Sequence, residues 1–119
     1  MARVELDDLV GDGETLAENH ALTSGENVVR GQALAMVTAT SKLAAYVHAD
    51  VGSAPFYGIA TTDSDATDGE LPSVGVYVKG IFNTNKVEFA SSLDDVEDIR
   101  ANARTKGIFF SAFVDATPV

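Results

Sequence analysis

From Gly25 onward, apolar residues occur in short runs separated by turn-forming residues, which is typical of a β-rich domain. The first run, residues 27–39 (NVVRGQALAMVTA), is rich in Val, Ala and Leu and contains Gly31. A glycine inside such a run indicates a bulge or turn between two short strands. A polar turn follows at Thr40–Ser41–Lys42. Further strands are predicted over residues 43–48, 56–62 and 74–82.

The polar stretches between these runs predict how the strands connect. Residues 62–73 (TDSDATDGELPS) form the most polar stretch and are expected to be a surface loop. Asn83–Thr84–Asn85 offers residues that tolerate left-handed backbone angles. The strand over 74–82 is therefore expected to form a hairpin with residues 86–90.

One helix is predicted near the C-terminus, with Ser92 as its cap and Asp95 three residues later, close to a capping box. Acidic residues crowd its start and basic residues its end, which complements the helix dipole, and Gly107 suits its C-terminal end. Residues 108–114 (IFFSAFV) are apolar enough to form a buried closing strand. The predicted apolar face of the helix consists of Leu93, Val96, Ile99 and Ala103.

Residues 1–25 keep no steady hydrophobic period and are strongly acidic, so they predict an extended N-terminal arm that precedes a β-rich domain over residues 26–119. The alternative is an edge strand around Arg3–Leu6, folded onto the domain. Apolar side chains supply most of the burial energy on docking, so those of the arm are candidate anchors on a partner. They are Val4, Leu6, Leu9, Val10 and Leu16.

Length and charge restrict the classes of function. A chain of 119 residues is expected to form one domain. Eight Lys and Arg against 18 Asp and Glu, a net charge of −10, argue against binding to nucleic acid or to an anionic membrane. Cysteine is absent from the sequence, which excludes disulfides, thiolate zinc sites and cysteine nucleophiles. No apolar run approaches the roughly 20 residues that span a bilayer, and no signal core is recognised, so synthesis in the cytoplasm is expected.

The polar residues do not form a specific catalytic, cofactor or metal motif. His20 and His48 lack ligand spacing, and a hydrolase using His48 with an acidic partner is a hypothesis with little support. The loop over residues 63–69 is similar to a calcium loop, but its glycine comes one residue late and Val74 takes the place of the final glutamate. A solvated loop is expected there, with an adventitious divalent-ion site as the alternative.

Residues 25–34 (GENVVRGQAL) are similar to the turn pattern of biotinyl and lipoyl carrier domains, which display a modified lysine at a hairpin tip. Lys42 lies downstream at a predicted turn and is the candidate for such a modification. However, Ser41 stands where those carriers have Met or Asp, and a C-terminal helix does not belong to their fold. A carrier domain modified on Lys42 is therefore the alternative hypothesis.

The order of features over residues 25–114 resembles the lambda-type phage head decoration proteins, which are capsid-stabilising or cement proteins. Residues 1–24 are not covered by this resemblance. No single piece is specific, but the order and spacing of the pieces together are. They are Val29-x-Gly31-Gln32-Ala33-Leu34, Lys42-Leu43-x-x-Tyr46, Phe56-Tyr57-Gly58-Ile59-Ala60, the acidic loop 62–70, Val76-Tyr77-Val78-Lys79-Gly80-Ile81-Phe82-Asn83 and Arg100-x-x-x-Arg104-x-x-Gly107-Ile108.

The resemblance implies an α+β fold: a small, β-tulip-like domain with a mixed sheet and one main helix near the C-terminus, preceded by the extended arm. It implies a protein without enzymatic activity or cofactor that binds the major capsid protein as a homotrimer. The expected sites are three-fold and quasi-three-fold positions on the outer surface of the expanded head, which the trimers would stabilise against internal DNA pressure. Candidate trimer contacts are Gly80, Ile81 and Phe82.

Overall fold

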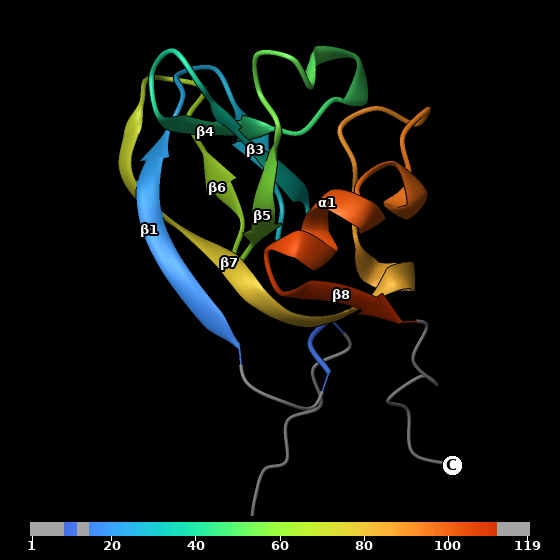
Figure 1. Cartoon of the computed structure of the whole chain (residues 1–119). Coiled ribbons are helices and arrows are strands. Elements are labelled where there is room, and N and C mark those ends of the chain that lie inside the picture. Colours follow the sequence, from blue (N-terminus) through green and yellow to red (C-terminus); the bar gives the residue numbers. More distant parts are fainter. Residues whose placement is uncertain (1–8, 12–14, 112–119) are drawn as a thin grey trace, which may run out of the picture.

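Five strands close into a small barrel in the computed structural model, which describes residues 9–11 and 15–111 (Figure 1). Around the barrel the strand order is β1-β4-β3-β5-β7, and β7 pairs back with β1. The β1–β4 contact is parallel, and the other contacts are antiparallel. The strands are β1 (Leu16–Leu22), β3 (Ala33–Val37), β4 (Lys42–Ala45), β5 (Phe56–Ala60) and β7 (Leu71–Asn83).

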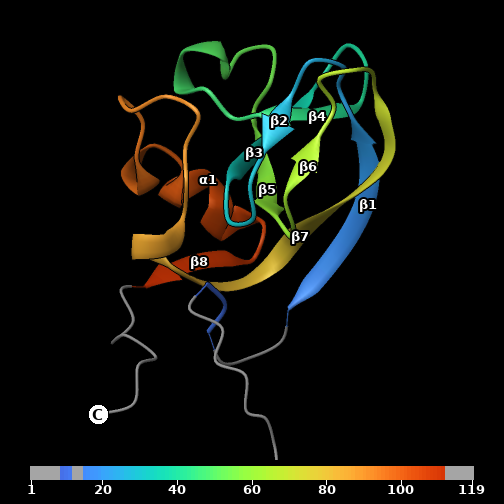
Figure 2. The ribbon, with the colours of Figure 1, turned by 180° about the vertical axis from the view of Figure 1, so that it is seen from behind.

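The remaining elements pack around this barrel. Strand β8 (Ile108–Ser111) runs parallel to the end of β7, and α1 (Arg100–Thr105) packs beside it (Figure 1). Strands β2 (Asn27–Val28) and β6 (Ser64–Asp65) form a separate two-stranded sheet, seen from behind in Figure 2. The short 3-10 turns are η1 (His48–Asp50), η2 (Thr84–Lys86) and η3 (Val96–Asp98). The predicted β-rich mixed fold with one helix near the C-terminus is confirmed.

Strand β3 separates two hydrophobic clusters, which explains its uninterrupted apolar sequence. Successive side chains of a strand point to opposite faces. Leu34 therefore joins the cluster inside the barrel, whereas Ala33 and Ala35 join the cluster beneath α1. A strand buried on both faces reads as a continuous apolar run rather than as an alternating one. The helix-side cluster also contains Tyr46, Phe56, Phe82, Ile99 and Ile108.

The turns around β3 and β4 agree with the sequence analysis. Gly31 lies between β2 and β3 with φ +90°, a conformation that a residue with a Cβ rarely adopts. The predicted strand over 56–62 corresponds to β5, and the predicted strand over 43–48 corresponds to β4 followed by η1. Ser41 takes the positive φ in the turn before β4.

The predicted helix is present but begins later than its sequence pattern indicated. Asp95, not Ser92, is the cap: its side chain accepts a hydrogen bond from Glu97 N–H, and the Asp98 side chain accepts one from Asp95 N–H. This reciprocal pairing opens η3, and α1 follows at Arg100. Val96, Ile99 and Ala103 are buried as predicted. Leu93 precedes the cap and is 90% exposed, so its assignment to the buried face was wrong.

The predicted hairpin between 74–82 and 86–90 is wrong. After β7, the chain turns through η2, and Asn83 caps this turn by accepting a hydrogen bond from Asn85 N–H. The chain then reaches β3 instead of folding back on β7, because Ala33 N–H donates to Glu88 O and Glu88 N–H donates to Gly31 O. Val87 and Phe89 pack against the helix-side cluster, so burial directs this segment away from β7.

Strand β1 was not predicted, since residues 16–22 were assigned to the arm. It pairs with β7 at six positions, from Leu16 opposite Lys79 to Leu22 opposite Leu71. Its side chains are mostly exposed, so backbone hydrogen bonds, not a buried apolar stripe, hold it in place. These residues belong to the barrel, and the arm assignment is wrong for them.

Strand β8 alternates between buried and exposed positions, where the sequence predicted a fully buried strand over 108–114. Ile108 and Phe110 face the helix-side cluster, and Phe109 faces outward. Residues 112–114 lie outside the described residues. Within the described part of the chain, no helix is long and apolar enough to cross a membrane.

A close approach between β5 and β7 leaves no room for a side chain at position 58. A Cβ placed on Gly58 would lie 2.2 Å from Tyr77 O. We expect Gly58→Ala to destabilise the fold by about 1–3 kcal/mol or more, because the two strands must separate. Urea unfolding followed by circular dichroism measures this. Gly52→Ala is the matched control, because no heavy atom lies within 4 Å of its added Cβ, and equal stability of the two variants would contradict the prediction.

Candidate capsid-binding face

Residues 9–11 are attached to one edge of β7 at the end of the barrel. Asn83 N–H donates to Leu9 O, and Gly11 N–H donates to Ile81 O, both at 2.7 Å. Val10 pairs antiparallel with Phe82 between these two bonds. This short segment therefore continues the antiparallel pairing of β1 along the rest of β7.

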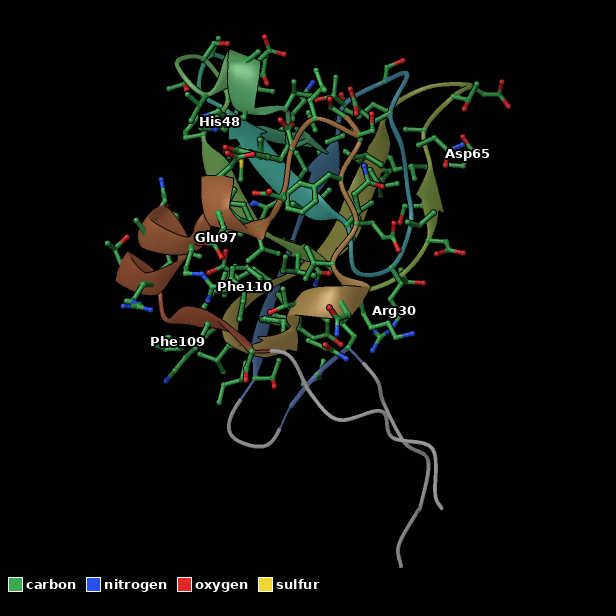
Figure 3. The ribbon with its side chains drawn as sticks, turned by 90° about the vertical axis from the view of Figure 1, so that its right-hand side faces the viewer. Arg30, His48, Asp65, Glu97, Phe109 and Phe110 are labelled. Atoms are coloured by element: carbon green, nitrogen blue, oxygen red, sulfur yellow. The ribbon has the colours of Figure 1, made fainter. Side chains whose placement is uncertain are left out.

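Strand β8 occupies the opposite edge of β7 at the same end. Ile81 is in register with Phe109 and Phe82 with Phe110. Partners in register project to the same side of a sheet, so the exposed side chains of Ile81 and Phe109 stand next to each other on the outside. Figure 3 shows Phe109 at the margin of the molecule and Phe110 further in. We call the surface formed by residues 9–11, Ile81 and Phe109 the end face.

The candidate arm anchors separate into three groups. Leu9 is buried in the helix-side cluster, and Val10 packs against it, so both contribute to the chain's own core. Leu16, at the start of β1, is 47% exposed and is available to a partner. Val4 and Leu6 lie outside the described residues.

The three candidate trimer contacts lie inside β7. Gly80 is buried with φ +146°, and an added Cβ would lie 3.3 Å from both Phe82 and Thr15 side-chain atoms. Phe82 is fully buried. Of the three residues, Ile81 presents its side chain to solvent, whereas Gly80 and Phe82 shape the strand that holds it.

A hollow of about 330 Å³ lies between β1, β5, β7 and the end of α1. We call it the β1 hollow. At its wall the Tyr57 hydroxyl donates to Glu18 Oε1 at 2.6 Å and lies 3.2 Å from His20 Nε2. Lys106 Nζ stands 6.0 Å from the centre of the Tyr57 ring. The hollow is lined by Leu16, Glu18, Tyr57, Val78, Lys79 and Lys106.

Hydrogen bonding shifts two pKa values in this hollow. The bond to the Glu18 carboxylate, together with burial, raises the pKa of Tyr57 to about 12. Bonds from His20 first and Tyr57 second lower the pKa of Glu18. Both groups therefore hold their ordinary neutral-pH forms, with Tyr57 protonated and Glu18 ionised.

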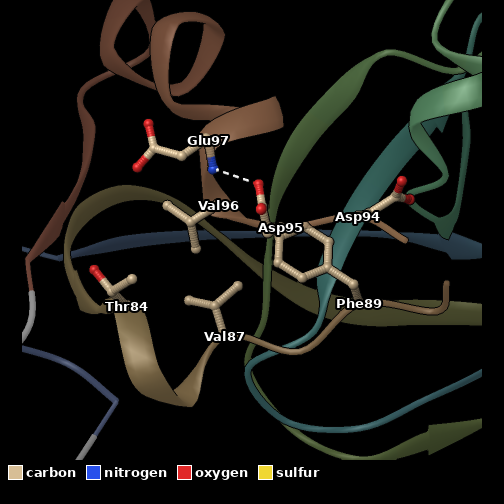
Figure 4. A pocket seen from close by; sticks show the side chains of 7 residues that line it. All are labelled: Thr84, Val87, Phe89, Asp94, Asp95, Val96 and Glu97. Carbon is tan, nitrogen blue, oxygen red and sulfur yellow. Dashed lines mark hydrogen bonds between the residues drawn. The ribbon is translucent and has the colours of Figure 1, made fainter. Parts of the chain in front are cut away.

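A second hollow, of about 370 Å³, lies beside η3, and we call it the η3 hollow (Figure 4). Its apolar floor is formed by Val87, Phe89 and Val96. Carboxylates line its rim, and one of them, from Asp95, accepts the hydrogen bond of the η3 cap. The polar lining residues are Thr84, Asp94, Asp95 and Glu97.

The residues considered as candidates for catalysis, modification or ion binding make hydrogen bonds to their neighbours. His48 Nδ1 lies 2.7 Å from the Tyr46 hydroxyl, and its backbone N–H donates to Asp94. Lys42 Nζ donates to Glu70 Oε1 at 2.5 Å and belongs to β4, just past the tip of its turn. Asp65 accepts hydrogen bonds from the backbone and hydroxyl of Thr67, which lower its pKa. Within residues 9–11 and 15–111, no group of three or more His, Asp and Glu side chains is arranged to hold a metal ion.

A sequence model of the family described as bacteriophage lambda head decoration protein D matches residues 9–109. The chain belongs to this family. The match begins at Leu9, so it includes residues that the sequence analysis set apart as an arm. A search of curated proteins finds no significant match.

Family membership assigns this chain to the decoration of phage capsids, a structural role. Decoration requires surfaces that bind another protein. The sequence does not indicate that two residues, Phe109 and Lys106, lie on such surfaces. The apolar run at residues 108–110 predicts that Phe109 is buried. Side chains of a strand alternate between its two faces, so the polar Ser111 is the signal that position 109 also faces outward. Lys106 is one of the basic residues near the end of the helix, and nothing in its sequence neighbourhood indicates that it lines the β1 hollow.

The different positions of Leu9 and Leu16 predict different effects of truncation. We expect Leu9→Ala to cost about 2–5 kcal/mol of folding free energy, because it removes buried methyl groups from the core. Leu16→Ala is expected to change stability by less than about 0.5 kcal/mol, because the side chain is half exposed. Thermal and urea unfolding of both variants checks this. A Leu9→Ala protein as stable as Leu16→Ala would show that residue 9 is not part of the core.

The Tyr57–Glu18 bond predicts how the protein behaves in alkali. The pKa of Tyr57 in the folded protein, about 12, lies above its unfolded value near 10, so this group's contribution to stability is complete below pH 10 and is lost as the pH rises through 12. Absorbance titration of the folded protein should show a late phenolate step near pH 12. The amplitude of this late step should fall by one tyrosine in Tyr57→Phe, whereas Tyr46, whose pKa burial also raises, keeps its own contribution. An unchanged late amplitude in Tyr57→Phe would contradict the assignment.

Proposed function

We propose that this chain decorates the phage head as a homotrimer on the outer surface, bound to the major capsid protein at three-fold and quasi-three-fold sites of the expanded shell. There it clamps neighbouring capsomers against internal DNA pressure and has no enzymatic activity. The single observation that supports this mode of binding is the end face, where residues 9–11 pair with one edge of β7 and the exposed Ile81 and Phe109 lie on β7 and on its neighbour at the other edge.

The end face suits contact with a shell for two physical reasons. First, two adjacent apolar side chains gain free energy when another protein covers them. Second, residues 1–8 join the fold at Leu9, on this same face, so Val4 and Leu6 enter the contact from a fixed point. We propose that this segment adds to a sheet edge of the major capsid protein, as extended peptides do.

Trimeric binding raises the total affinity above that of the contact made by a single copy. Three copies of the segment in one trimer raise the effective concentration of each next contact, so the assembly holds strongly although each segment is short. A protein that binds only the expanded shell stabilises that state by mass action. The net charge of −10 keeps the free copies apart in solution until they meet a complementary site.

The test is co-sedimentation of the purified protein with shells of its cognate major capsid protein, before and after expansion. We expect saturable binding to expanded shells alone, in multiples of three copies per site. Absence of binding to both forms would overturn the proposal, and equal binding to both would overturn its dependence on expansion.

Variants of the end face sharpen the same experiment. Deletion of residues 1–8 and the double variant Ile81→Ser, Phe109→Ser should each fold and bind at least about tenfold more weakly, because each removes apolar contact area. A longer deletion, of residues 1–20, is unsuitable because it removes Leu9 and most of β1. Val29→Ser is the matched control, since Val29 is also exposed but belongs to the connection after β2. Unchanged binding by both end-face variants would show that another surface contacts the shell.

A further inference from the structure

Leu93 is the most exposed of the large apolar side chains in the described structure, with 90% of its surface open to solvent. It stands on a well-braced loop. Leu93 N–H donates to Ser91 Oγ and Asp94 N–H donates to Ser91 O, both at 3.2 Å. Asp94 Oδ2 accepts a hydrogen bond from His48 N–H at 3.0 Å, which ties the loop to η1. These hydrogen bonds fix the loop with Leu93 pointing outward. Binding of Leu93 to another surface therefore costs little conformational entropy.

Single exposed leucines are common on protein surfaces, so the surroundings of Leu93 decide its meaning. The residues that follow it are strongly acidic, and three of their carboxylates line the η3 hollow. Leu93 is thus an apolar tip beside the carboxylates of Asp94 and Asp95, whereas Glu97 forms an ion pair with Arg100 at 2.9 Å. We call residues 93–97 the acidic knob; its carboxylates are Asp94, Asp95 and Glu97.

The β1 hollow has the opposite character. Its lining has apolar walls and one carboxylate, Glu18, which accepts the hydrogen bond of the Tyr57 hydroxyl. The apolar walls come from Leu16, Val78 and the Tyr57 ring, and two lysines, Lys79 and Lys106, outnumber the carboxylate. In a chain with eight basic and 18 acidic residues, two lysines at one hollow make a local exception to the overall charge. Its volume of about 330 Å³ exceeds what one leucine side chain needs.

We propose that the acidic knob of one protomer docks into the β1 hollow of its partner. Leu93 enters between the apolar walls, and the carboxylates that follow it face Lys106 on the rim. The assignment of a second copy as the occupant rests on charge complementarity between the two surfaces and on the proposed homotrimer. An apolar anchor inside a hollow, ringed by opposite charges, is the arrangement that carries most of the energy in protein interfaces.

The positions of the two surfaces fit a head-to-tail ring. The loop before η3 lies on one flank of α1, and β1 lies on the other (Figure 1). A protomer that receives a knob in its hollow therefore still offers its own knob to the next copy. Such a contact between two different surfaces closes into a ring when each copy is turned by a fixed fraction of a circle, and a turn of 120° gives three copies.

Cysteine cross-linking tests this contact directly, because the natural chain has no cysteine. Leu93→Cys is combined in turn with Leu16→Cys, Val78→Cys and Lys106→Cys, and each protein is oxidised in solution and on expanded cognate shells. We expect at least one pair to give covalent dimers and trimers. Leu93→Cys alone, and Leu93→Cys with Val29→Cys as the matched pair, should give no trimer.

The outcomes separate this inference from the proposed function. Shell binding with no cross-linked trimer from any of the three pairs would overturn the knob contact and leave the decoration proposal standing. Cross-linked trimers without shell binding would support the contact and overturn the proposed binding mode. Absence of both would overturn both.

Substitutions that do not involve cross-linking give a second measurement. Leu93→Ser should weaken self-association, followed by sedimentation velocity and by trimer occupancy on shells, by roughly thirtyfold, because it removes the anchor. Lys106→Glu and Asp94→Lys should each weaken it about tenfold, and their combination should recover part of the loss. Val29→Ser should have no effect. Full self-association by Leu93→Ser, or no recovery in the charge swap, would contradict the proposed contact.

Discussion

Backbone pairing along both edges of β7 is the constraint on which the rest of the structure depends. Tyr77 pairs with Ala17 on one side and with Ile59 on the other, which closes the barrel. Further along, Phe82 pairs with Val10 on one side and with Phe110 on the other. One 13-residue strand thus joins the first residues of the described fold, the barrel and the final strand. Small residues at close approaches, above all Gly58, allow the neighbouring strands to reach it.

This pairing also creates the end face, which is the surface proposed to bind the shell. The end face combines residues 9–11 with Ile81 and Phe109. These distant parts of the sequence meet because residues 9–11 pair with residues 81–83 on one edge of β7, and β8 pairs with residues 80–83 on the other. His48, the residue of the hydrolase hypothesis, contacts Tyr46, and Lys42, the candidate for modification, binds Glu70. One end of the fold presents exposed apolar side chains, and these polar side chains make hydrogen bonds within the fold. This arrangement is consistent with a protein that decorates a capsid.

The distribution of charge affects both the repulsion between free copies and their proposed association. A net charge of −10 repels free copies from one another, and that repulsion acts over about 8 Å at physiological salt. In the proposed contact, the lysines of the β1 hollow attract a partner's acidic knob in one orientation, and apolar contact then contributes at short range.

The sequence by itself determined the features that local chemistry controls. Apolar runs located β3 and β5, Gly31 and Gly107 marked turns that need positive φ, and the order of motifs identified the family. Only the tertiary structure decided which segments pair and which side chains are covered. Strand β1 is held by backbone groups that every residue carries, so its side chains gave no signal. Leu9 and Leu93 are the same residue type in acidic surroundings, yet one is buried and the other exposed, because burial depends on what the rest of the chain places against each of them.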